Sequence, residues 1–90
     1  MNQESRIALR LLPDRLSLIS RAVLARDDLC ASVLLETAML EQYEECIDAA
    51  LEMLRAMIVD RNFRSALLLI NALSLNLYNS EAMPIAEDSP

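Results

Sequence analysis

The chain has 90 residues, of which 54% are hydrophobic although only two Tyr and one Phe are aromatic, and its formal net charge is −6. A chain of this length forms a single domain and buries about 60 to 65% of its unfolded surface, so a partner could add much to its stability. It has no histidine, the commonest general base and metal ligand, and no glycine, which phosphate-binding loops require. These absences argue against an enzyme, and neither a metal, a cofactor nor a small-molecule substrate is expected.

Leu, Ala, Ile, Val and Met supply nearly all of the apolar content, and no proline occurs between Asp14 and Met83. Such a composition favours helices over strands. Without glycine, turns that need a positive φ are expected to use Asn or Asp, so the helices should be joined by short polar breaks. No internal repeat is evident. The sequence predicts an all-α protein: a three-helix antiparallel bundle with a kinked first helix, completed by dimerisation or by a partner.

The first helix is expected over about residues 3–26. Pro13 lies inside it and predicts a kink or a break near Leu12. Residues 1–26 carry a net charge of +3, and Arg10 and Arg21 share a face at helical spacing. The first helix is therefore predicted to be amphipathic, with a mostly basic side.

A second helix is expected over residues 29–60, with Asp27 or Asp28 as its N-cap. It would be about 48 Å long. It could protrude, pair with a second copy or break near Glu36 and Thr37, and a continuous helix is the favoured prediction. The third helix, residues 63–79, is apolar nearly all round, which indicates burial on more than one side and hence a homodimer or an obligate partner. The acidic tail, residues 81–90, is predicted to be disordered.

The stretch EQYEECIDAALEMLRAM, residues 41–57, carries an acidic ladder that repeats every three or four residues. On a helical wheel its carboxylates share one outward face: Glu41, Glu44, Glu45, Asp48 and Glu52. Metal sites in helical bundles need ligands that converge from several helices, so no metal site is expected. Two interpretations stay open. The ladder is either a solvated face that pairs with the chain's own arginines, or an acidic surface that receives a basic partner through Glu41, Glu45, Asp48 and Glu52.

Glu36 departs from this pattern, because the same wheel places it within the apolar sector. It is predicted to form a buried ion pair with Arg10 or Arg21, within the chain or across a dimer. The alternative is a polar specificity point in an interface.

An apolar surface for a partner helix is expected on the third helix and on the Met-bearing face of the second. The candidate residues are Met53, Met57, Phe63, Leu67, Ile70, Leu73 and Leu77. The function expected is a non-enzymatic interaction module; its size, charge and architecture are similar to those of the small acidic helical chaperones and regulators that hold secretion substrates in bacteria. The alternative is an inhibitor or immunity-type protein that presents the acidic face to a cationic, even a nucleic-acid-binding, target.

Nucleic-acid binding by the chain itself is not expected, because the net charge is negative and no aromatic residue lies beside the arginines. The N-terminus lacks the apolar core of a signal peptide, and the longest strongly apolar run, Ala66 to Ile70, is too short to span a bilayer. Cys30 and Cys46 fit no zinc or redox pattern and are expected as free thiols. A soluble cytoplasmic protein without membrane insertion is predicted.

Overall fold

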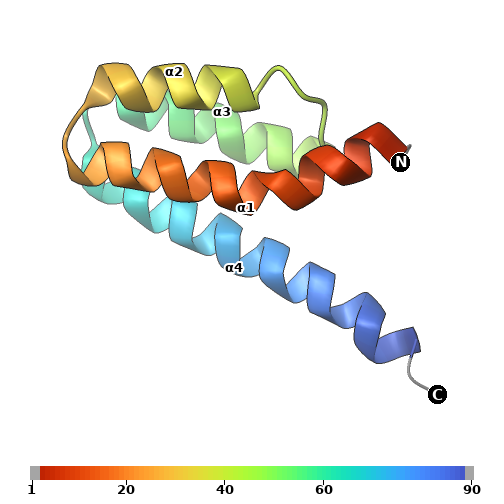
Figure 1. The fold of residues 1–90 in the computed structure, drawn as a ribbon. Helices are drawn as coiled ribbons and strands as arrows, with labels where there is room; N and C mark the ends of the chain where they lie inside the picture. The colour runs from red at the N-terminus through yellow and green to blue at the C-terminus, as the bar shows by residue number, and fades with distance from the viewer. Residues whose placement is uncertain (1–2, 89–90) are drawn as a thin grey trace.

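Four helices, rather than the expected three, make up the part of the protein that the structure describes (Figure 1). The structure, a computed structural model, describes the backbone of residues 3–88 and the side-chain surroundings of residues 9–79. The helices are α1 (Gln3–Leu24), α2 (Asp28–Ala38), α3 (Glu45–Val59) and α4 (Phe63–Asp88). α1 and α3 each pack against both α2 and α4, so the helices surround one core. The all-α bundle is confirmed, and the count of three helices is wrong.

The expected continuous helix over residues 29–60 is interrupted between Ala38 and Glu45. The Tyr43 hydroxyl donates a hydrogen bond to the Ala38 carbonyl oxygen (3.2 Å) at the end of α2, in addition to the bond that this oxygen accepts from the Glu41 N–H (3.3 Å). Glu44 has an extended backbone (φ −65°, ψ 153°) and is the N-cap residue of α3. The break lets α2 pack against α1 and α3 pack against α4, and each half of the segment contributes to the core.

Two nearly identical turns connect α1 to α2 and α3 to α4. Arg26 and Arg61, both with φ 58°, occupy the left-handed position just after the helix. The N–H of the following residue donates a hydrogen bond to the carbonyl oxygen five residues earlier, from Asp27 to Ala22 (2.9 Å) and from Asn62 to Met57 (2.8 Å). This is the Schellman pattern of helix termination. The expectation that Asn or Asp would take the positive φ is therefore wrong: arginine takes it in both turns.

Asp27 and Asn62 have a different role, because each caps the helix that follows. The Asp27 carboxylate accepts a hydrogen bond from the Cys30 N–H (3.0 Å), and the Asn62 side-chain oxygen accepts one from the Ser65 N–H (3.4 Å). Each turn thus ends one helix and starts the next within a few residues, which holds the two helices of a hairpin antiparallel.

The two hairpins, α1–α2 and α3–α4, repeat the same burial pattern at an offset of 35 residues. The matched buried pairs are Leu12 and Ile47, Leu16 and Leu51, Ile19 and Leu54, Val23 and Ile58, Ala31 and Ala66, Leu35 and Ile70, and Ala38 and Leu73. The turns match at the same offset, from Arg26 to Arg61. The exceptions are Ala22 and Leu77, whose counterparts Met57 and Gln42 are not buried. The two hairpins therefore form a structural repeat, which the sequence analysis did not find.

The first and last helices extend to the ends of the described backbone. α1 begins at Gln3 as predicted and runs through Pro13 as one helix, so of the predicted kink or break the break does not occur. α4 continues to Asp88, through most of the segment predicted to be disordered, while Ser89 and Pro90 lie outside the described residues. The C-terminal part of α4 extends away from the other three helices (Figure 1). No helix in the described residues is both long enough and apolar enough to cross a membrane.

Candidate interaction surfaces

The acidic ladder lies on α3 and on the connection before it, and it is mostly exposed. Glu41, Glu44, Glu45 and Glu52 are exposed, and Asp48 is half-buried. Three of its members, Glu44, Glu45 and Asp48, stand at the N-terminal turn of α3, where the helix dipole favours negative charge. The ladder therefore stabilises the start of α3 in addition to making one side of the molecule acidic.

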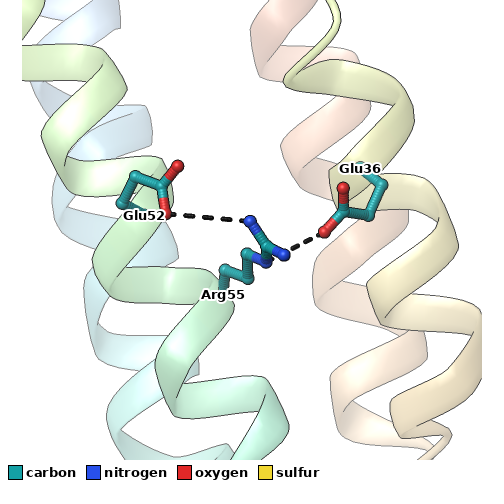
Figure 2. A network of polar contacts seen from close by, with 3 residues as sticks. All are labelled: Glu36, Glu52 and Arg55. Atoms are coloured by element: carbon teal, nitrogen blue, oxygen red, sulfur yellow. Dashed lines mark ion pairs between the residues drawn. The ribbon is translucent and has the colours of Figure 1, made fainter.

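Arg55 forms ion pairs with two acidic residues, one on α2 and one on α3 (Figure 2). Its Nε lies 3.0 Å from Glu36 Oε1 on α2, and its Nη1 lies 3.9 Å from Glu52 Oε2 on α3. The prediction for Glu36 is corrected on two counts: its partner is Arg55 rather than Arg10 or Arg21, and the pair is about half exposed. Arg10 and Arg21 are exposed on α1. Exposed pairs of this kind contribute about 0 to 1 kcal/mol to stability.

Two acids of the ladder, Glu41 and Asp48, affect the ionisation of Tyr43. Burial raises the pKa of the Tyr43 phenol above its ordinary value of 10.0; Arg15 lowers that pKa, whereas Glu41 and Asp48 raise it. The phenol is therefore neutral at physiological pH and serves as a hydrogen-bond donor that closes the α2–α3 connection. Because the phenol keeps its proton at physiological pH, it is unsuited to act as a general base.

Arg15 is the residue in this region that the sequence analysis missed. It is half-buried on α1, and its Nη1 has no accessible surface and no hydrogen-bond partner among the described residues. The available signal was its position, because Arg15 falls outside the row of Arg10, Asp14, Ser17 and Arg21 that shares the basic face. Its guanidinium places one positive charge near the acids that surround Tyr43.

The arrangement offers few groups for chemistry in the described part of the chain. No three His, Cys, Asp or Glu side chains converge there as metal ligands. Cys30 and Cys46 are exposed free thiols, as the sequence predicted for their state. What the described surface does offer is contact area of two kinds, acidic and apolar.

The predicted apolar partner surface divides into core and surface residues. Ile70, Leu73 and Leu77 are buried within the chain's own core, and Met57, Phe63 and Leu67 pack partly against it. Only Met53 is well exposed, at 55%. The three buried residues are therefore not available to a partner in this fold.

Large exposed apolar side chains occur on all four helices, including Leu11, Leu18 and Leu24 on α1 and Met53 and Val59 on α3. One group of them lies on the outer faces of α2 and α4. On α4 these are Leu68 (64% exposed), Leu75 (62%) and Tyr78 (69%). At the matching positions of the first hairpin, α2 carries exposed Val33, and exposed Leu40 follows the helix. Leu29 adds a third apolar side chain at the start of α2. We define two outer stripes, each an exposed row of side chains that also includes one polar residue. The α4 outer stripe is Leu68, Asn71, Leu75 and Tyr78, and the α2 outer stripe is Leu29, Val33, Glu36 and Leu40.

Comparisons with protein-family models, with curated proteins and with solved structures gave no match.

Proposed function

We propose that this chain is a non-enzymatic protein–protein interaction module of the chaperone or regulator type, which docks apolar helical surfaces. The observation that supports it best is the exposure of large apolar side chains at helical spacing on the outer faces of α2 and α4. Amphipathic helices recognise each other through anchors three, four and seven residues apart, which is the spacing of both outer stripes.

The energy available from these stripes is sufficient for specific binding. Burying an exposed leucine, valine or aromatic side chain contributes about 1.5 to 3 kcal/mol. Three such side chains on one stripe thus supply several kcal/mol, from which the entropy cost of association is subtracted. A module of this kind binds with moderate affinity and releases its partner readily.

The proposal is tested by placing a photoreactive amino acid at Val33 or Leu75 and irradiating cells of the source organism. Adducts with protein are expected at both positions, because both side chains are exposed apolar anchors. The matched control is the same amino acid at Ser17, which is exposed on the basic side of α1 and outside both stripes. Equal labelling at Ser17 and at the stripe positions would contradict the proposal.

A second candidate function is an acidic inhibitor or immunity-type protein. The observation that favours it is that Glu41, Glu44 and Glu45 are exposed and form no ion pair with any residue whose side chain is described. A cationic target bound there would dissociate in about 0.5 M salt, which shortens the screening length below 5 Å. Glu45→Arg would weaken that complex and leave binding through the outer stripes unchanged. This variant therefore distinguishes the two functions.

A further inference from the structure

The α4 outer stripe has the spacing of a helix-pairing seam. Leu68, Asn71, Leu75 and Tyr78 follow one another at intervals of three, four and three residues. This is the heptad alternation that keeps one line of side chains facing a second helix. Two of the apolar members stand on either side of Asn71, which is also exposed. The stripe therefore has an apolar–polar–apolar order along its length.

The segment that carries this stripe has no charged side chain. From residue 65 to residue 80 the sequence SALLLINALSLNLYNS contains no Asp, Glu, Lys or Arg, in a protein whose net charge is −6. Two copies of an acidic protein repel each other over most of their surfaces. They approach most easily where such charges are absent, and residues 65–80 of α4 form the longest such segment.

The equivalent face of the first hairpin lacks this property. At the offset of 35 residues, Asn71 of α4 corresponds to Glu36 of α2, and Glu36 is engaged by Arg55 on α3. The α2 outer stripe also begins beside Asp27 and Asp28. Two α2 stripes brought together would oppose several carboxylates, whereas two α4 stripes would oppose amides. The carboxamide of Asn both donates and accepts hydrogen bonds, so it is complementary to its own copy, and a carboxylate is not.

We infer that the α4 outer stripe is the contact between two copies of this chain. The inference rests on the proposed function, in that the outer stripes are docking surfaces, and it assigns α4 to a second copy and leaves α2 for another protein. Such an interface is self-complementary, as a twofold contact requires. Asn71 supplies a polar layer within an apolar seam, which favours one register over its slipped alternatives.

The contact is small, because each copy contributes one helix face. Interfaces below about 1,200 Å² belong to weak and transient complexes. The expected dimer is therefore concentration-dependent, with a dissociation constant on the order of tens of micromolar.

The test is sedimentation equilibrium of the full chain from about 5 to about 500 µM, a range that brackets such a dissociation constant. The wild-type mass is expected to rise from the monomer value of 10.1 kDa toward twice that value. Leu68→Glu and Leu75→Glu should each weaken self-association at least tenfold. Asn71→Glu, which gives α4 the acid that α2 has, should do the same, while Asn71→Gln should retain most of the association.

The matched control is Val33→Glu, which makes the same change at the α2 position equivalent to Leu68. It should leave self-association unchanged. Circular dichroism at the lowest concentration checks that each variant is folded. The inference is overturned if the wild type stays monomeric throughout the range, or if Val33→Glu abolishes association and Leu75→Glu does not. A monomeric wild type that still gives photoadducts at position 75 with other proteins would overturn the inference and leave the proposed function standing.

Discussion

The two arginines in the turns show how single residues determine where helices end. Asn and Asp were expected at positive φ because they tolerate the left-handed region better than other residues except glycine. The structure instead uses Asp27 and Asn62 as N-caps, one residue later, and leaves the left-handed position to Arg26 and Arg61. The sequence shows that Arg26–Asp27 and Arg61–Asn62 are polar breaks between helices. It does not show which residue of each pair is the N-cap and which takes the left-handed conformation. That choice depends on where packing ends the preceding helix.

The strain in these turns leads to a prediction about Arg26 and Arg61. Arg26→Gly should raise the free energy of unfolding by up to about 1 kcal/mol, because glycine adopts the left-handed conformation without a Cβ clash. Arg61→Gly should show little or no gain. Arg61 Nη1 lies 3.1 Å from Asp28 Oδ1 on α2, and Arg61 Cζ lies 5.3 Å from the centre of the Phe63 ring. Losing these contacts offsets the relief of backbone strain.

The measurement is denaturant unfolding of both variants and the wild type in one buffer. A larger stabilisation from Arg61→Gly than from Arg26→Gly would contradict the account of the turns.

At the scale of helices, Glu36 was the sign that the expected long helix is broken. Its place in the apolar sector assumed one continuous wheel from residue 29 to residue 60. Continuing α2 at 100° per residue places Ile47 half a turn away from Ala38, yet both are buried in the same core. The apolar pattern thus changes phase between the two helices. An acid that does not fit a wheel can therefore indicate a break as well as a buried ion pair.

α1 gives the helix-scale prediction, because it runs through Pro13. Proline inside a helix removes one backbone hydrogen bond and clashes with the preceding turn, at a cost of about 3 kcal/mol. Pro13→Ala should therefore raise the free energy of unfolding, by about 1 to 3 kcal/mol. Asp14→Ala, at the adjacent exposed position, is the control and should change stability by less than about 0.5 kcal/mol.

Thermal unfolding followed by circular dichroism measures both variants. A lower melting temperature for Pro13→Ala would show that the core needs the shape that proline gives α1, contrary to this prediction.

At the scale of the molecule, composition was sufficient to predict an all-α bundle, but not its repeat. The matched core positions of the two hairpins conserve burial rather than identity, as in the pairs of Leu12 with Ile47 and Ala38 with Leu73. A comparison of residue types along the chain therefore finds little. The repeat becomes visible once the buried positions are known.

The candidate partner surface was only partly predictable for a related reason. α4 is apolar nearly all round, so its sequence does not distinguish the side that faces the core from the side that faces outward. With α2 and α3 as separate helices, the chain has enough surface to bury Ile70, Leu73 and Leu77 by itself. The side left open is that of Leu68, Leu75 and Tyr78. The local wheel of α3 accounts for the outward position of Glu45 and Glu52, whereas Glu41 and Glu44 precede that helix and are exposed in the connection.

The orientation of α4 is the central claim, and paired substitutions at Leu73 and Leu75 test it most directly. The measurement is the free energy of unfolding at a protein concentration low enough to exclude self-association. Leu73→Asp should lower it by about 3 kcal/mol or more, because it places a carboxylate in the core. Leu75→Asp should change it by less than about 0.5 kcal/mol, because this side chain is already in water. Equal destabilisation by both variants, or a larger effect at Leu75, would contradict the account.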